Sequence, residues 1–350
     1  MTGPYRLYGA ELSPYSQKVR SYLAYAGTSF EWVNRANARQ EEIQRYAKLP
    51  LLPILVGADD EAKQDSTPII EFLESENPKL TPDDAAIGFL AALLEDYADE
   101  WLNKAMFHYR WTKDVDQQSA AERLVAGMFE GEDPPNRDTL VAAVRERMAN
   151  RLRHVGSTAD TGPIIEASFE RFLGFLETLL EGRSYLFGAR PSIADFGIAA
   201  QLDQMLSDPT PGALMRERAP RVIVWVRRMK DAKNEGAFDT FDAVSPSFAP
   251  LLQSELAITY LPWGAANADG VARDASNVSV SIGDKRFAQA PQRYAAKAFA
   301  ELQRKYAAAD SAALTSFLES AGCASFLASS GLLSSGVTAS DDDESDDDEE

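Results

Sequence analysis

The chain has 350 residues and a formal net charge of −19, with 45% apolar and 25% charged side chains. That length suits two globular domains with added segments better than a single core. Nine acidic side chains fall within the ten residues 341–350, so the rest of the chain is only moderately acidic. Because such a charge balance repels phosphate backbones, we expect no nucleic-acid partner.

Cysteine and histidine are scarce. Cys323 is the only cysteine, which excludes an intramolecular disulfide, a Cys-x-x-Cys redox pair and a thiolate zinc cluster, and we read it as a small buried residue. With only His108 and His154, a histidine-based metal site is also hard to build, so we expect no metal. No secretory signal precedes the first strand-like run, and no apolar segment reaches the roughly 18 residues of a membrane span. We therefore expect a cytoplasmic protein without a membrane span.

The first 80 residues alternate between strand and helix signals. The expected strands are 5–8, 30–33, 52–56 and a return strand near 63–64, and the expected helices are 14–26, 39–47 and 66–76. This βαβ, loop, ββα order predicts a small mixed sheet with flanking helices.

Only helices are expected from residue 83 to residue 230. They are 83–111, 120–129, 138–154, 164–180, 193–206 and 220–229. Before the fifth of these, Ser192 and Asp195 have the spacing of a capping box, which predicts a buried helix.

The last part of the chain has weaker signals. A hairpin of 278–282 with 285–287 and helices at 293–306 and 312–320 are expected, and the Ser-rich, acidic residues after Ser329 cannot bury enough apolar surface to fold. We divide the chain into an N-terminal domain (1–79), a helical domain (80–245), an extension (246–328) and a disordered acidic tail (329–350).

Ser13 is the first residue with potential chemistry. It precedes Pro14 at the start of the first helix, where unpaired amides and the helix dipole favour a negative charge. A thiol bound there would lose its proton more readily, and the Ser13 hydroxyl could donate a hydrogen bond to the thiolate. Taken alone, however, a serine before a helix is more often an ordinary N-cap.

Two further motifs follow Ser13 along the chain. Leu52-Pro53 enters a strand, where a cis peptide would expose backbone groups to a peptide ligand, although a trans edge-strand proline is the ordinary alternative. Asp65-Ser66 opens a helix and offers an acid and a hydroxyl, which suit the ammonium and carboxylate of an amino-acid-like ligand. As an isolated pair, Asp65-Ser66 would be just another helix cap.

The three motifs together resemble the glutathione transferase superfamily. They occur in the family's order, at intervals of about 40 and then 12 residues, within segments 5–20, 52–55 and 65–70. In the second half, 185–188 and the capping box are similar to the family's capping-box helix. The resemblance covers residue 5 to about residue 232. It implies an α/β thioredoxin-like N-terminal domain followed by the all-α glutathione-transferase C-terminal domain.

The resemblance also implies roles for individual residues. Ser13 falls where the family activates the glutathione thiol, Leu52 and Pro53 where it binds the peptide backbone, and Asp65 and Ser66 where it anchors the γ-glutamyl group. Tyr8 falls near the tyrosine that activates glutathione in other classes, or it is plain packing, and we rank Ser13 first. Since serine cannot form a mixed disulfide, thiol reduction is disfavoured.

Two features depart from the family pattern. Leu51-Leu52 stands where Gly-Lys usually precedes the cis proline, which removes a cation unless Lys48 or Arg39 replaces it. The extension after about residue 245 exceeds the family's usual length and could cover the cleft or a partner surface.

Polar residues also lie on the first long helix of the second domain, where the family places its acceptor pocket: Asp96, Glu100, His108, Arg110 and Trp111. An apolar stripe at helical spacing runs along the same helix. We therefore favour an ordinary helix with solvated or ion-paired charges.

Two functions remain open at this point. The resemblance implies a glutathione transferase that activates glutathione, as co-substrate, for attack on a hydrophobic electrophile, and that pairs into a homodimer unless the extension remodels that surface. The alternative is a non-catalytic interaction or scaffold protein, whose extension and acidic tail engage a basic partner.

Overall fold

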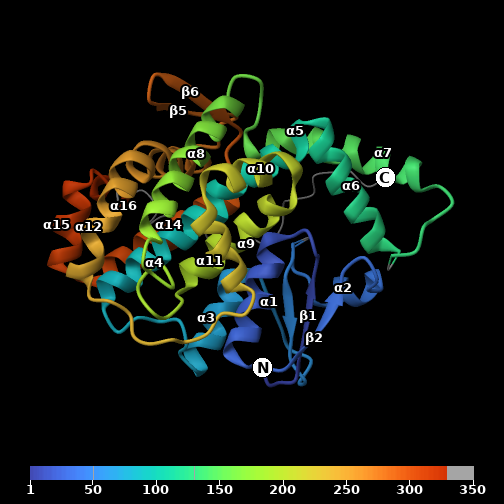
Figure 1. The fold of residues 1–350 in the computed structure, drawn as a ribbon, viewed down its shortest axis with the longest axis horizontal. Coiled ribbons are helices and arrows are strands. Elements are labelled where there is room, and N and C mark those ends of the chain that lie inside the picture. The colour runs from blue at the N-terminus through green and yellow to red at the C-terminus, as the bar shows by residue number, and fades with distance from the viewer. Residues whose placement is uncertain (50, 130, 329–350) are drawn as a thin grey trace.

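The computed structural model describes residues 1–49, 51–129 and 131–328. The first domain contains the strands β1 (Tyr5–Gly9), β2 (Phe30–Asn34), β3 (Ile54–Val56) and β4 (Ala62–Gln64) and the helices α1 (Pro14–Ala26), α2 (Gln40–Tyr46) and α3 (Ser66–Glu76). The strands form one sheet in the order β2-β1-β3-β4, in which β2 is parallel to β1 while β3 and β4 are antiparallel to their neighbours (Figure 1). The predicted mixed sheet with flanking helices is confirmed.

Side-chain alternation in β1 assigns the two faces of this sheet. Leu7 packs in the main core with Val19 of α1 and Ile69 of α3, whereas Tyr8 packs on the opposite face with Ile43 of α2. The sheet therefore separates the α1 and α3 layer from the α2 layer.

Between residues 85 and 229, the regular elements of the second domain that the structure describes are all helices. Its helices are α4 (Ala85–Tyr97), η1 (Ala98–Leu102), α5 (Asn103–Thr112), α6 (Asp114–Met128), α7 (Arg137–Ala149), η2 (Asn150–Val155), α8 (Gly162–Leu179), α9 (Ile193–Ser207), α10 (Pro209–Arg218) and α11 (Pro220–Met229). The expected long helix 83–111 corresponds to α4, α5 and the π-helical turn η1 between them. Helix α10 was not predicted, because its prolines and glycine indicate a loop although proline is tolerated in a first helical turn.

The predicted capping box is confirmed at the start of α9. One carboxylate oxygen of Asp195 accepts the Ser192 backbone N–H at 2.9 Å, and the other accepts the Leu186 N–H at 2.9 Å. Both residues of the box are fully buried. Asp195 thus fixes the start of a buried helix and the loop before it.

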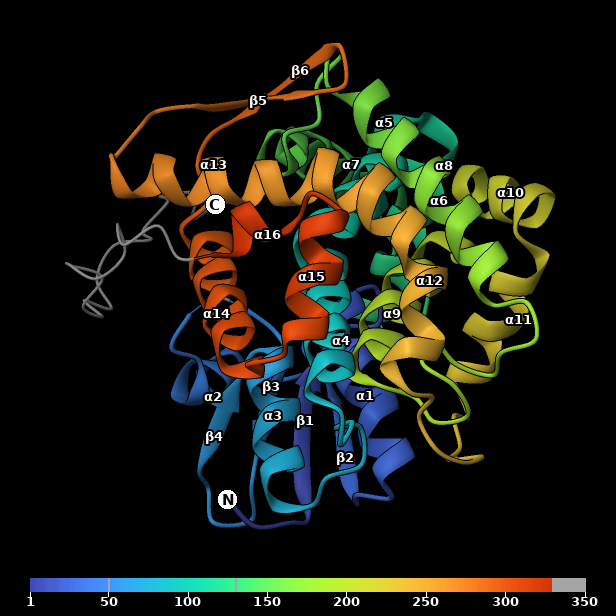
Figure 2. The same ribbon diagram turned by 90° about the vertical axis from the view of Figure 1, so that its left-hand side faces the viewer.

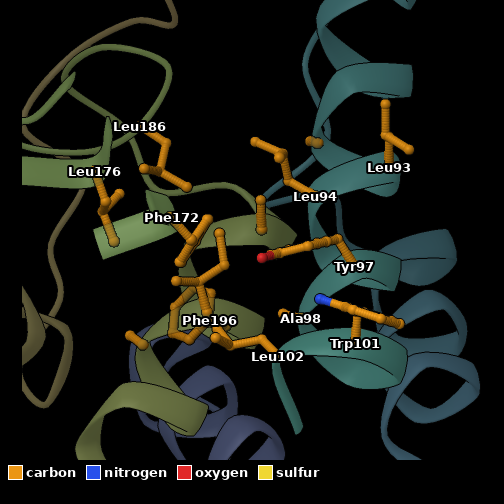
Figure 3. Close-up of a cluster of buried hydrophobic side chains, with 14 of the residues drawn as sticks. Leu93, Leu94, Tyr97, Ala98, Trp101, Leu102, Phe172, Leu176, Leu186 and Phe196 are labelled. Atoms are coloured by element: carbon orange, nitrogen blue, oxygen red, sulfur yellow. The ribbon is translucent and has the colours of Figure 1, made fainter. Parts of the chain in front are cut away.

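The core of the helical domain lies between α4 with η1 on one side and α8 with α9 on the other. Figure 3 shows Leu94, Tyr97 and Leu102 directed toward Phe172 and Phe196. The rings of Tyr97 and Phe172 lie 5.0 Å apart between centroids. This packing holds α4 in place, and α4 in turn carries acidic side chains toward the first domain.

The extension folds against the helical domain. It contains α12 (Phe241–Leu251), η3 (Leu252–Tyr260), α13 (Leu261–Ala272), β5 (Val278–Ile282), β6 (Lys285–Gln289), α14 (Arg293–Ala309), α15 (Ala312–Ser320) and α16 (Ala324–Leu327). The predicted hairpin and the helices α14 and α15 are confirmed. Helical turns from 241 to 272 were missed because the prolines at 246, 250 and 262 indicate breaks.

Helix α14 stands beside α4, and the β5–β6 hairpin lies at the end of the molecule opposite the sheet (Figure 2). The domain limits stay predictions, and the one at residue 245 falls inside α12. The expected disordered tail lies outside the described residues. Within the described part of the chain, no helix is both long enough and apolar enough to span a bilayer.

Candidate functional site

The second and third sequence motifs are joined directly, and the helix of the first motif contacts the helix of the third. The Asp65 backbone N–H donates to the Pro53 carbonyl at 2.9 Å, which joins the second motif to the third. Lys18 follows Ser13 in the same helix, α1. Its ammonium donates to the hydroxyl of Thr67, the residue after Ser66, at 3.1 Å. Hydrogen bonds thus connect the third motif with the second, 12 residues earlier, and with the helix that follows Ser13, 49 residues before Thr67.

Ser13 is the N-cap of α1. Its hydroxyl oxygen accepts the Ser16 backbone N–H at 3.3 Å, and the side chain is half-buried. Among the described residues, no protein group accepts the hydroxyl hydrogen of Ser13. The hydroxyl can therefore donate to a bound anion at the positive end of the α1 dipole.

Sequence reasoning expected Arg110 to be an ordinary helix charge and missed that it holds the loop before Ser13. Arg110 donates to the Leu12 carbonyl at 3.0 Å, while its Nε donates to buried Asp208 at 2.8 Å. Arg110 is itself buried, and a buried arginine needs such partners. No local sequence pattern links Arg110 with Leu12, because the contact joins two different domains.

The peptide bond between Leu52 and Pro53 is cis, as the second motif allowed. The loop before it is held by Gln64 of β4, which the sequence analysis also missed. The Gln64 side chain accepts the backbone N–H of Lys48 at 3.0 Å and donates to the carbonyl of Leu51 at 2.7 Å. One amide side chain therefore fixes the approach to the cis proline.

Asp65 adopts a backbone conformation that favours glycine, with φ of 80° and ψ of 142°, and it is the N-cap of α3. Its Oδ1 accepts the Ser66 backbone N–H at 2.5 Å. Burial raises the pKa of Asp65 to about 6, while the Lys18 charge opposes that shift. Asp65 is therefore largely ionised at neutral pH and able to bind a cation.

Lys18 lies at the centre of a buried charge cluster between the two domains. Its Nζ donates to Asp99 Oδ2 at 2.6 Å and also to Glu95, and it lies 3.5 Å from the Ser66 hydroxyl. Only 1% of its side chain is exposed. Lys18 holds the pKa of Glu95 below its usual value against the effect of burial, so this pair is ionised.

Tyr8 lies on the α2 face of the sheet. Its hydroxyl donates to Glu42 and accepts from Arg6 at 3.0 Å. Burial and the Glu42 carboxylate raise the pKa of Tyr8. A phenol held in this way is a poor donor to a thiolate, which supports ranking Ser13 ahead of Tyr8.

Asp96, His108 and Arg110 of the first long helix have structural partners. Tyr260 donates to Asp96, and His108 lies 2.7 Å from the Ser157 hydroxyl and 3.2 Å from Glu166. Burial raises the pKa of Asp96 to about 7 and lowers that of His108. These contacts agree with the interpretation of ordinary ion-paired and hydrogen-bonded side chains.

Two cavities lie next to the helices α1 and α3, whose N-caps are Ser13 and Asp65. A cavity of about 470 Å³ opens between α1 and α9 and is lined by Gln17, Phe196 and Gln204 among others. A second, of about 320 Å³, lies where α3, α4 and α14 meet. Neither is lined by Ser13 or Asp65.

Comparison with known proteins gives a consistent result. Residues 7–81 match the family model for the glutathione S-transferase N-terminal domain, and residues 138–228 match the model for its C-terminal domain. A curated relative, the isoprene-epoxide glutathione S-transferase of Rhodococcus sp. (strain AD45), is 22% identical over 225 residues, which cover 63% of this chain and 92% of the relative.

Solved structures of the same kind are also similar. A glutathione S-transferase from Rhodospirillum rubrum is 22% identical, covers 84% of this chain and 99% of its own, and has a TM-score of 0.44. One from Methylobacterium radiotolerans, in complex with glutathione sulfonate, is 22% identical over 68% of this chain and 97% of its own, with a TM-score of 0.39. The two domain models, matched in order on a mixed-sheet domain and a helical domain, show that the chain belongs to the glutathione S-transferase superfamily.

Proposed function

We propose that this protein binds glutathione beside Ser13, favours the thiolate form of the bound thiol and directs it at a hydrophobic electrophile. The observation that carries the proposal is the link between the cis Leu52-Pro53 bond and the Asp65-Ser66 turn, beside the helix that Ser13 caps and whose Lys18 contacts Ser66. The Rhodococcus relative is named for glutathione transfer to an epoxide, which is an electrophile of the proposed class.

The charges around Asp65 suit the amino-acid end of glutathione. The ionised Asp65 carboxylate would take the α-ammonium, and the start of α3 with Ser66 would take the α-carboxylate. Lys18 lies 3.5 Å from the Ser66 hydroxyl and adds a positive charge on the carboxylate side. The site is therefore polarised in the direction that an α-amino acid requires.

The proposed chemistry needs little from the protein beyond binding and thiol activation. The thiol proton passes to solvent, and the Ser13 hydroxyl donates a hydrogen bond to the resulting sulfur anion. The sulfur anion then forms a bond to the electrophilic carbon. The bond from that carbon to its leaving group breaks, and its electron pair goes to the leaving group or, in an epoxide, to the ring oxygen.

Thiolate absorbance in the ultraviolet tests the proposal directly. Titrating glutathione with protein near neutral pH should give a saturable rise, and Ser13→Ala should abolish it and lower conjugation by about 10²- to 10³-fold. Ser29→Ala, at an exposed position just after the same helix, is the matched control and should behave as the parent protein. Turnover unchanged in Ser13→Ala would remove Ser13 from the mechanism.

A non-catalytic scaffold is the second candidate. The pair Leu51-Leu52, of which Leu51 is exposed, stands where the family usually has a cation before the cis proline, and this favours weak glutathione binding. Under this alternative, the parent protein gives no absorbance rise at saturating protein concentration. We also propose a cytosolic location, which suits a chain whose single cysteine is buried and without a disulfide partner. The homodimer likewise stays a prediction, to be checked by light scattering.

A further inference from the structure

The extension reaches the proposed glutathione site through Tyr294 in the first turn of α14. The Tyr294 hydroxyl donates to Oδ2 of Asp65, which lies 229 residues away in the sequence. The other carboxylate oxygen, Oδ1, accepts the Ser66 backbone N–H. Both oxygens of Asp65 are thus oriented, one by its own helix and one by the extension.

The start of α14 is firmly anchored. Buried Asn267 of α13 accepts the Gln292 backbone N–H at 2.7 Å and donates to the Gln292 carbonyl at 2.9 Å. Buried Lys104 of α5 donates to Gln289 at 3.0 Å and to the Gln292 side chain at 3.3 Å. Tyr294 therefore extends from a fixed segment, so its contact with Asp65 belongs to the folded architecture.

This contact leaves room for a ligand. A carboxylate offers about four acceptor positions, and the Ser66 N–H and the Tyr294 hydroxyl use two of them. The titratable groups that act on Asp65 from the neighbouring helices are Lys18 of α1, Glu95 of α4, and Asp99 and Glu100 of η1. Burial raises the pKa of Asp99 and of Glu100, so the ionised carboxylates are mainly Asp65 and Glu95. These two still outnumber the single lysine, and an ammonium group is the favoured occupant.

We propose that Tyr294 is a positioning residue of the γ-glutamyl subsite, which fixes the Asp65 carboxylate in the orientation that receives the ligand's α-ammonium. The extension thereby completes the glutathione site that the first domain begins. This inference rests on the proposed function, and it assigns to the extension a part in ligand recognition.

Calorimetric binding of two ligands tests this role. Tyr294→Phe keeps the ring and removes the hydroxyl, and it should weaken glutathione binding by about 3- to 10-fold. Binding of the glutathione analogue that lacks the α-amino group should not change, because that analogue makes no use of the oriented carboxylate. Tyr306→Phe is the matched control: its hydroxyl, on the same helix, contacts Thr315 instead, and glutathione binding should be unchanged.

Two results would overturn the inference. Equal weakening for both ligands would indicate a general structural role, and tighter glutathione binding in Tyr294→Phe would mean that the tyrosine competes with the ligand. If the parent protein binds no glutathione, the proposed function fails by itself. The Tyr294 role is then decided by a carboxyl ¹³C NMR titration without ligand: removing the donor should raise the Asp65 pKa, and an unchanged pKa refutes the inference.

Discussion

Replacing Lys18 by methionine should strongly destabilise the contact between the two domains. The lysine ammonium is buried and neutralises Glu95 and Asp99, which belong to the second domain. Methionine keeps a similar apolar stem, so the substitution removes the charge without opening a large cavity. The loss is therefore mainly electrostatic.

The expected magnitude follows from burial. Removing one partner of a buried ion pair costs about 3–5 kcal/mol, because the other charge stays buried without compensation. Burial and its acidic neighbours raise the pKa of Asp99 to about 7, so this group can take up a proton when Lys18 is lost. Protonation relieves part of the penalty, and we expect a decrease near the lower end, about 3 kcal/mol, in the free energy of unfolding at pH 7.5.

The pH dependence has a definite sign. Lys18 depresses the pKa of Glu95, so the stabilisation from their pairing is present above the unfolded pKa of Glu95 and is lost as pH falls. In the parent this loss falls below the ordinary pKa of a glutamate. In Lys18→Met, burial acts on Glu95 and Asp99 without an opposing charge, so these groups take up protons at a higher pH than in the parent, and the gap in stability should shrink as pH falls from 7.5 to 4.5.

Urea unfolding at several pH values measures this gap. Lys230→Met is the control, since Lys230 is 62% exposed and pairs with Asp203 at the surface, where such pairs contribute at most about 1 kcal/mol. A Lys18→Met effect no larger than that of Lys230→Met, or a gap that grows at low pH, would refute the argument.

Two further predictions concern the glutathione site. Burial raises the Asp65 pKa to about 6, so glutathione affinity measured by calorimetry should fall about tenfold from pH 7 to pH 5 as the carboxylate is protonated. Asp65→Asn should remove this pH dependence. An equally steep dependence in Asp65→Asn would exclude Asp65 as its source. Gln64→Ala should speed amide hydrogen exchange at Lys48 and Leu49 and weaken glutathione binding while leaving the sheet folded, whereas unchanged protection at both amides would show that Gln64 does not hold the loop.

The sequence predicted the local parts of this structure well. Ser13 at the start of α1 and the capping box of α9 are signals carried by neighbouring residues, and both appear at the expected positions. Helix ends of this kind follow from hydrogen bonding within a few residues. The alternation of strand and helix patterns then predicted the order of the first domain.

Contacts between distant segments were not predictable from the sequence. The roles of Lys18, Gln64 and Arg110 depend on partners in other elements, and a lone polar residue on a helix or strand does not indicate which partner it meets. The helical turns from 241 to 272 were missed for a different reason. Tertiary packing there overrides the proline signals, which on their own indicate a loop.

The arrangement of the extension bears on the choice between an enzyme and a scaffold. Helix α14 turns its apolar residues Ala295, Phe299 and Leu302 into the main core, where it packs along α4. Lys305 of α14 also forms an ion pair with Glu71 of α3 at 2.6 Å. A helix that contacts both domains in this way restrains α3, whose first turn carries Asp65 and Ser66. Loss of the extension should therefore impair the glutathione site itself. A scaffold protein whose extension only engages a separate partner would not show this effect.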